Sequence, residues 1–321
     1  MLRRIIVPLD GSAFAETAIP AAAGLARGLR GHLELVMVHS PALSGPSPTA
    51  ALAQDARIRA YEEAYVIQKA RSSAEAADGP VASSVLDGPV AATLIDHVRA
   101  RKADLVVMTT HGRNGLSRFF LGSVADRLVR ELHCPILLLP PESPQVPEPG
   151  AGARILIPLD GSALAASVLG RAAAVLPPAA ALELVRVVVL PATPLPPEAA
   201  WGVPSEILDE ELSIATHYLE DVAATLRARG QLVHTRVLSH WSPAAAIADY
   251  AEERHCDLIA LATRGESGLQ RALLGSVADK IIRSARLPVL VWNPPAGASN
   301  RKGNGMEEAV EKRAAAVGTP A

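Results

Sequence analysis

The sequence predicts an α/β chain of two repeated doubly wound domains, each a five-stranded parallel sheet flanked by helices. Three observations support this prediction. The stretch Arg4-Ile-Ile-Val-Pro-Leu-Asp-Gly-Ser12 recurs 150 positions later as Arg154-Ile-Leu-Ile-Pro-Leu-Asp-Gly-Ser162. In both copies, apolar runs of strand length alternate with longer helical patterns, which is typical of a parallel sheet covered on both faces. The chain has 321 residues, which is enough for two domains of ordinary size.

A second shared segment confirms the duplication and sets the expected boundaries. Leu121-Gly-Ser-Val-Ala-Asp-Arg-Leu-Val-Arg130 recurs 153 positions later as Leu274-Gly-Ser-Val-Ala-Asp-Lys-Ile-Ile-Arg283. The stretch between the copies is too rich in proline and glycine for a helix or a central strand. We therefore expect a first domain over 1–141, a linker over 142–153, a second domain over 154–295 and a flexible tail over 296–321.

The elements of the first repeat follow in regular order. Its expected strands are 4–7, 33–39, 81–86, 104–109 and 136–139, and its expected helices are 12–30, 52–77, 90–102 and 122–132. The second repeat has the same order and ends with a strand at Pro288–Trp292. In such a sheet, ligands bind at the carboxyl ends of the strands where the winding reverses. The loops after the first, second and fourth strands are therefore the expected functional loops.

The last strand of each repeat is short and wholly apolar, at 136–139 and 289–292. Because an open apolar edge favours pairing with another strand, we expect the two repeats to pack together as an internal pseudo-dimer. Association of whole chains into a homo-oligomer stays open.

Charge and cysteine content bear on partners and location. The formal net charge is −2, without a dense run of lysine and arginine, so no nucleic-acid partner is expected. Pro8 and Asp10 interrupt the first apolar run well short of a membrane span, and we expect a soluble, cytoplasmic protein without a membrane partner. Cys134 and Cys256 are far apart and are expected to be packing residues rather than a disulfide or a metal site.

A loop rich in glycine follows the fourth strand of each repeat and leads into a helix, at Met108–Ser123 and Leu261–Ser276. The start of a helix offers unpaired N–H groups and a positive dipole end to an anion, and glycine allows a close approach. Gly122-Ser123 and Gly275-Ser276 are therefore candidate phosphate sites. The alternative is that the glycines only make turns and the serines only cap helices.

Both glycine-rich loops resemble the ATP-binding motif of the universal stress protein family. In the first repeat Gly112 is followed by nine residues and then by Gly122-Ser123, and in the second Gly265 is followed in the same way by Gly275-Ser276. The resemblance covers nearly the full length of both repeats. It implies a regulatory protein that binds an adenine nucleotide, with ATP, with or without Mg²⁺, as the cofactor. One departure stands out, because Thr109 and Ala262 occupy the place of the motif's leading glycine.

The resemblance also implies which residues contact the nucleotide. Asp10 and Asp160 would face the adenosine, although each could instead cap the helix that follows. Val38 and Val187 would present backbone to adenine, and Met108 and Leu261 would line the ribose. The full set of candidate binding residues is Asp10, Val38, Met108, Thr109, Gly112, Arg113, Gly122, Ser123, Asp160, Val187, Leu261, Ala262, Gly265, Gly275 and Ser276.

The two candidate sites differ. Arg113 follows the first loop glycine, whereas Glu266 stands at the matching place of the second repeat. His240 and Trp241 replace a small turn after the third strand of the second repeat, and could stack on a ligand or block the site. These differences favour the first site.

Two other functions remain open. No Walker-type phosphate loop, no Gly-x-Gly-x-x-Gly after the first strand and no catalytic residue set is found, so slow ATP hydrolysis is the only enzymatic activity considered. The other alternative is an interaction protein whose nucleotide clefts are vestigial.

Overall fold

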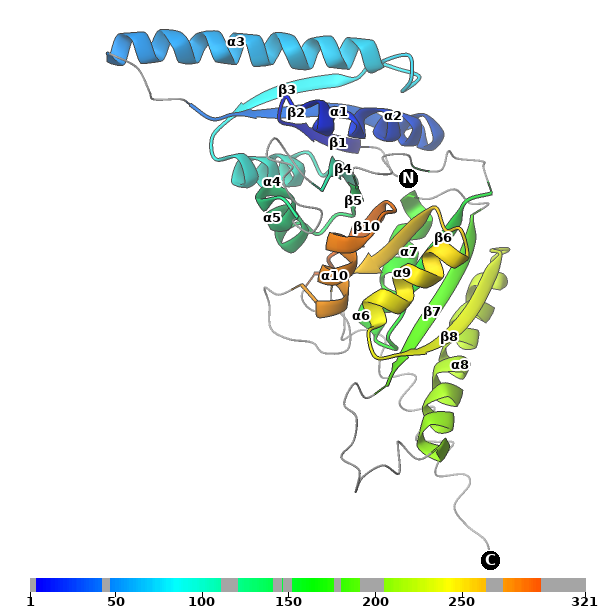
Figure 1. The fold of residues 1–321 in the computed structure, drawn as a ribbon. Coiled ribbons are helices and arrows are strands. Elements are labelled where there is room, and N and C mark those ends of the chain that lie inside the picture. Colours follow the sequence, from blue (N-terminus) through cyan, green and yellow to red (C-terminus); the bar gives the residue numbers. More distant parts are fainter. Residues whose placement is uncertain are drawn as a thin grey trace, which may run out of the picture.

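A computed structural model of the chain describes residues 4–41, 47–110, 121–140, 146, 152–175, 180–190, 205–263 and 274–295. The strands form a single sheet with helices on both faces (Figure 1). The expected tail, 296–321, lies outside the described residues. So does the expected linker, 142–153, apart from Val146, Gly152 and Ala153.

Both repeats contain the same succession of elements. The first comprises β1 (Arg4–Leu9), α1 (Ala13–Glu16), α2 (Ala18–Leu29), β2 (His32–His39), α3 (Pro48–Ser73), β3 (Ala82–Asp87), α4 (Val90–Ala100), β4 (Leu105–Thr109), α5 (Ser123–Glu131) and β5 (Ile136–Leu139). The second comprises β6 (Arg154–Pro158), α6 (Ala163–Ala166), α7 (Val168–Val175), β7 (Ala181–Val189), α8 (Ser205–Arg227), β8 (Val233–His240), α9 (Pro243–Glu253), β9 (Leu258–Ala262), α10 (Ser276–Ser284) and β10 (Val289–Trp292).

The ten strands are arranged in the order β3-β2-β1-β4-β5-β10-β9-β6-β7-β8. Within each repeat all neighbours are parallel, which confirms the predicted fold class. The two halves meet where β5 and β10 pair antiparallel, with Val289 opposite Leu138 and Val291 opposite Ile136. The last strands therefore join the repeats, as their apolar composition predicts.

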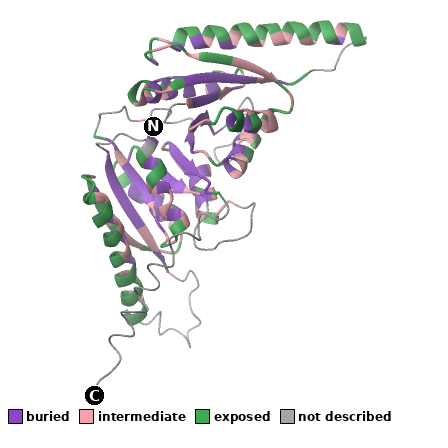
Figure 2. Cartoon of the chain, turned by 180° about the vertical axis from the view of Figure 1, so that it is seen from behind, coloured by how far each residue is buried: buried purple, intermediate pink, exposed green. Residues whose placement is uncertain are grey.

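The core lies in two layers, one on each face of the sheet. Successive strand residues point to opposite faces, so Ile5 and Val7 belong to one layer and Ile6 to the other. The first layer is completed by α1 to α3 and α6 to α8, and the second by α4, α5, α9 and α10. Figure 2 shows buried strands between helices whose outer surfaces are exposed. Burial on both faces explains the nearly continuous apolar strand sequences.

Several helix boundaries differ from the sequence prediction by a few residues, and two of the differences have a clear local reason. The helix expected over 12–30 is divided at Thr17, because the ring of Pro20 would clash with the carbonyl of Glu16 in an unbroken helix. The third helix begins at Pro48, four residues earlier than expected. Ser47 caps it by accepting a 3.2 Å hydrogen bond from the N–H of Ala50, and proline suits the first helical position.

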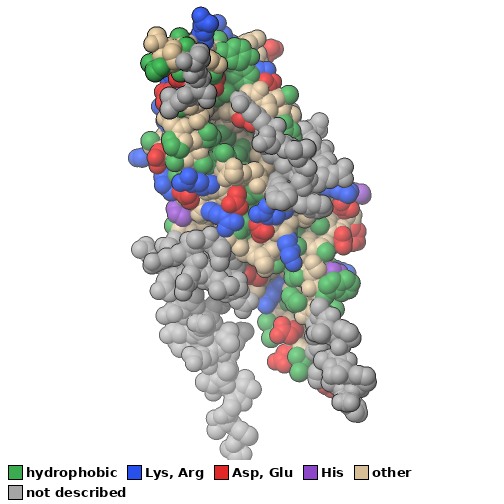
Figure 3. All heavy atoms as spheres, turned by 60° about the vertical axis from the view of Figure 1, so that its left-hand side comes forward, with side chains coloured by type: hydrophobic (Ala, Val, Ile, Leu, Met, Phe, Trp, Pro, Cys, Tyr) green, Lys and Arg blue, Asp and Glu red, His purple; other side chains and the backbone are tan. Residues whose placement is uncertain are grey.

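Within the described ranges, every helix is too short or too polar to cross a membrane. Basic and acidic side chains lie side by side on the face of the molecule that Figure 3 shows.

Candidate functional site

In each repeat the winding of the sheet reverses between the first and fourth strands. β1 lies between β2 and β4, and β6 lies between β7 and β9. The connections leaving the carboxyl ends of such neighbouring strands diverge and leave a crevice between them. The candidate residues that the structure describes lie at these ends and at the starts of α5 and α10.

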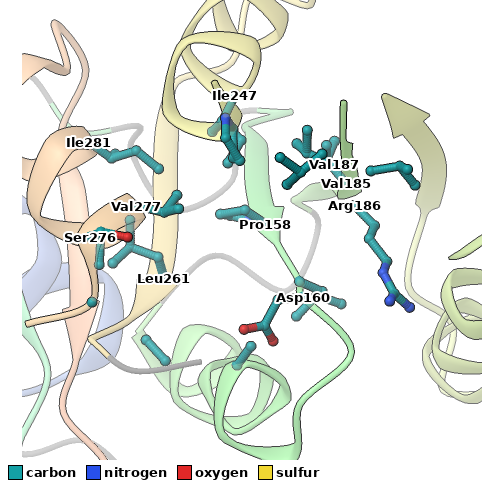
Figure 4. Close-up of a pocket in the computed structure, with 18 of the residues that line it drawn as sticks. Pro158, Asp160, Val185, Arg186, Val187, Ile247, Leu261, Ser276, Val277 and Ile281 are labelled. Atoms are coloured by element: carbon teal, nitrogen blue, oxygen red, sulfur yellow. The ribbon is translucent and has the colours of Figure 1, made fainter. Parts of the chain in front are cut away.

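A pocket of about 540 Å³ lies at this place in the second repeat (Figure 4). Six of the seven residues predicted for the second repeat line it, namely Asp160, Val187, Leu261, Ala262, Gly275 and Ser276. The seventh, Gly265, lies outside the described residues, as does Glu266. In Figure 4, Ser276 and Val277 of α10 form one side of the pocket and Val187 of β7 lies on the opposite side.

Gly275 and Ser276, the candidate phosphate residues of the second repeat, form the start of α10. Gly275 is the N-cap residue and Ser276 is the first helical residue, and no side chain caps the helix. The alternative that Ser276 is a helix cap is therefore wrong. The N–H of Gly275 donates a 2.7 Å hydrogen bond to the carbonyl of Thr263, which ties the helix start to the end of β9. The next N–H groups belong to the first turn, where a helix supplies no acceptor of its own.

The backbone at the N-cap glycines has an ordinary conformation. Gly275 has φ −61° and ψ 144°, and the N-cap Gly122 of α5 has φ −57° and ψ 148°, values that any residue can adopt. Neither position therefore requires glycine for its backbone angles.

Asp160 both holds a turn and lines the pocket. Its Oδ1 accepts a 2.9 Å hydrogen bond from the N–H of Ser162, and Ser162 in turn caps α6. The first repeat repeats this arrangement with Asp10, which accepts from the N–H and the hydroxyl of Ser12 at 2.9 and 2.6 Å. The alternative that these aspartates cap the following helix is therefore wrong, because Ser12 and Ser162 are the N-caps and the aspartates hold the turn before them. In the second repeat Asp160 also lines the pocket.

Other residues of the pocket were missed from the sequence. α8 supplies Ile207 and Glu211, α9 supplies Ile247 and β7 supplies Arg186. Ile207 and Glu211 are four residues apart, which places them on one face of a helix, but the sequence does not show which face turns toward the sheet end. Figure 4 shows the Arg186 side chain directed away from Val185 and Val187.

The Arg186 guanidinium lies over the ring of Tyr218, 5.5 Å from its centroid. Burial, and secondarily the charge of Asp160, raise the pKa of Tyr218 to about 12. Tyr218 is the counterpart of Tyr65, whose hydroxyl donates a 2.8 Å hydrogen bond to Glu16 in the first repeat. The position of that glutamate is taken by Ala166 in the second repeat, so the two sites have different polar surroundings.

The first repeat places its candidate residues on the matching elements. Those described are Asp10, Val38, Met108, Thr109, Gly122 and Ser123, at the ends of β1, β2 and β4 and at the start of α5. The N–H of Gly122 donates a 2.8 Å bond to the carbonyl of Thr110, as at the start of α10. Gly112 and Arg113 lie outside the described residues. The prediction that Arg113 makes the first site the better one therefore stays a prediction.

A buried histidine next to Val38 fixes α3 to the first sheet end. His39 is 1% exposed, with Nδ1 2.7 Å from Glu62 and Nε2 3.2 Å from Asp55, both on α3. Burial alone would lower the pKa of His39, but the hydrogen bonds to Glu62 and Asp55 outweigh it and raise the pKa above its ordinary value. Valine stands at the corresponding place in β7.

His240 and Trp241 stack on each other, with ring centroids 4.1 Å apart, and the tryptophan is 64% exposed. Neither is among the residues lining the described pocket.

Burial raises the pKa of both Cys134 and Cys256 to about 12, consistent with packing roles. In the part of the chain that the structure describes, no three His, Cys, Asp or Glu side chains gather into a group that could hold a metal ion.

Comparison with known proteins gives consistent results. The profile of the universal stress protein family matches residues 1–140 and 153–293. The chain is 30% identical over 294 residues to a universal stress protein of Mycobacterium tuberculosis, covering 89% of this chain and 95% of the relative. It is 37% identical over 145 residues to one of Methanocaldococcus jannaschii, covering 44% of this chain and 82% of the relative. The crystal structure of a universal stress protein from Archaeoglobus fulgidus aligns with a TM-score of 0.63 and 18% identity, covering 91% of this chain and 97% of that one.

Proposed function

The chain belongs to the universal stress protein family, and we propose that it is a regulatory protein that binds an adenine nucleotide, ATP, at the carboxyl ends of its strands. The observation that carries the proposal is the pocket of the second repeat. Its volume, about 540 Å³, lies within the range usual for small-molecule sites. It combines an apolar wall with the amide-bearing start of a helix, and six of the seven residues predicted for the second repeat line it.

The chemistry of the pocket suits the parts of a nucleotide. Val187 and Ile247 supply apolar surface for a base, and Leu261 would line the ribose. The first-turn amides of α10, beginning at Ser276, would donate hydrogen bonds to phosphate oxygens. Asp160 lies between these regions at the end of β6, where a carboxylate can accept a hydrogen bond from a ribose hydroxyl.

We extend the proposal to the first repeat, where Asp10, Val38, Met108 and Ser123 would take the same parts. Gly112 and Gly265 are proposed to close the loops over the phosphates, and Arg113 to pair with them in the first site. Mg²⁺ enters the proposal only as a counter-ion carried by the phosphates. Binding rather than rapid hydrolysis is proposed, because the sequence contains no Walker-type phosphate loop and no recognisable catalytic residue set.

The test is a calorimetric titration of the full chain with ATP, ADP and AMP, together with mass analysis of any nucleotide retained through purification. Gly275→Val should remove the part of the binding that belongs to the second repeat, because its side chain would occupy the phosphate surface. Gly170→Ala is the matched control, since Gly170 lies on α7 with open space around an added Cβ. Absence of both retained nucleotide and measurable binding would support the vestigial-cleft alternative, and phosphate release during incubation would reveal hydrolysis.

A further inference from the structure

Asn293, the residue after β10, is a buried polar side chain at the junction between the two repeats. It is 4% exposed and belongs to the second repeat. Its Nδ2 donates a 2.7 Å hydrogen bond to the carbonyl of Arg130, in the last turn of α5 of the first repeat. Carbonyls in the last turn of a helix find no N–H donor within the helix. The bond from Asn293 therefore supplies the Arg130 carbonyl with a donor from outside the helix.

The bond to Arg130 determines which way the Asn293 amide points. A carbonyl only accepts, so the amide NH₂ must face Arg130 and the amide oxygen must face the other way. That oxygen lies 3.2 Å from the Oγ1 of Thr263, which therefore donates to it. Thr263 is 3% exposed and lines the pocket.

Thr263 carries the connection to the helix start. Its N–H donates a 2.8 Å bond to the carbonyl of Trp292, and its own carbonyl accepts the 2.7 Å bond from Gly275, the N-cap of α10. A continuous set of hydrogen bonds thus runs from α5 of the first repeat through Asn293 and Thr263 to the proposed phosphate site of the second. His133 adds a second attachment, with its Nδ1 3.1 Å from the Asn293 carbonyl oxygen.

The corresponding place in the first repeat is different. There the carbonyl of Thr110 accepts the bond from Gly122, and Leu139 accepts from the N–H of Thr110, so the backbone pattern is repeated. The residue that corresponds to Asn293 is Pro140, which has no polar side chain. Pro140 therefore cannot make the side-chain bonds that Asn293 makes.

We propose that Asn293 is a positioning residue for the second site, and that the first repeat holds the phosphate-binding end of α10 in place through it. The inference rests on the proposed function for its ligand, but the positioning can be measured without any nucleotide. The second site is then completed by a contact from the other repeat, whereas the first site is not completed in this way.

The test uses the full chain labelled with ¹⁵N-glycine, in which the amides of Gly275 and Gly122 report on the two helix starts. Thr263→Val keeps the shape of the side chain but removes its donor. Without nucleotide, exchange of the Gly275 amide with solvent should accelerate on the order of tenfold, as expected for the loss of about one buried hydrogen bond. The Gly122 amide, in the same sample, should be unchanged and shows that the protein remains folded.

Two more variants separate positioning from general damage. Thr263→Ser restores the hydroxyl and should restore the slow exchange of Gly275. Asn293→Asp keeps an acceptor for Thr263 but replaces the donor that faces Arg130, so Gly275 should again exchange faster. Unchanged Gly275 exchange in both Thr263→Val and Asn293→Asp would overturn the proposal, and so would equal acceleration at Gly122.

Titration of the same samples with ATP tests the consequence for binding. The shift of the Gly275 resonance should give an affinity about five- to tenfold weaker in Thr263→Val, with recovery in Thr263→Ser. The shift of the Gly122 resonance should follow the wild-type curve. If ATP moves neither resonance in the wild type, the proposed function fails, while the exchange rates still decide whether Asn293 positions the helix.

Discussion

Gly161, next to Asp160 at the pocket, has a backbone that disfavours any side chain. Its φ is +99°, outside the regions open to most residues. In Gly161→Ala an added Cβ would also lie 3.2 Å from the Nη1 of Arg186, closer than such contacts usually are. We therefore expect this substitution to destabilise the second repeat.

The expected loss is the sum of two effects. A left-handed backbone conformation costs an alanine about 1–2 kcal/mol. Arg186 has a flexible end and can move by a few tenths of an ångström, so the contact adds less, about 0.5 kcal/mol. The free energy of unfolding should fall by about 2 kcal/mol. Gly170→Ala, at an exposed helical position, should instead raise it by about 0.5–1 kcal/mol, because glycine is a poor helix former.

Urea denaturation of the wild type and both variants measures these changes from the midpoint at constant slope. The two alanine variants should lie on opposite sides of the wild type. If Gly161→Ala were as stable as the wild type, the backbone at Gly161 would not be held in the conformation described, and the reasoning would be refuted.

Further predictions concern charge and the first site. His39→Gln should lower the free energy of unfolding most near about pH 6 and less near about pH 8.5. The raised pKa of His39 means that its charged form stabilises the fold at low pH, and this stabilisation is lost as the pH rises. A loss in urea denaturation that does not change with pH would contradict this. Gly122→Val should abolish ATP binding at the first site while leaving the circular dichroism spectrum intact, and wild-type affinity would refute its placement. Glu266→Arg, outside the described residues, should tighten the second site by up to about tenfold at low salt in calorimetric titrations, and an unchanged affinity would contradict the charge argument.

Much of the fold could be predicted from the sequence because its signals are local. The apolar runs are strands since both sheet faces are buried, and the duplicated segments place the two repeats in the same order. The apolar composition of the last strands was sufficient to predict the pairing of β5 with β10. The start of α3, which lies four residues before the predicted one, also has a local signal in Ser47 followed by Pro48, since serine caps helices and proline suits the first helical position.

The candidate site was only partly predictable. The candidate residues at strand ends were found because the predicted strands show which residues follow each strand. Ile247 and Glu211 were missed because their contribution depends on how α9 and α8 turn toward the sheet. Asn293 was missed because its partners, Arg130 and Thr263, lie 163 and 30 positions away, and no local pattern brings them together.

The two strands that pair at the centre of the sheet are synthesised at different times. β5 is complete at Leu139, but its partner begins at Val289, about 150 residues later. At about 5–20 residues per second, β5 emerges from the ribosome roughly 8–30 s before β10 can pair with it. During that interval its wholly apolar edge can pair with the same edge of a neighbouring nascent chain. In the tandem arrangement, pairing of β5 with β10 of the same chain therefore competes with pairing of β5 with another chain. Slower translation of the second repeat favours pairing between chains.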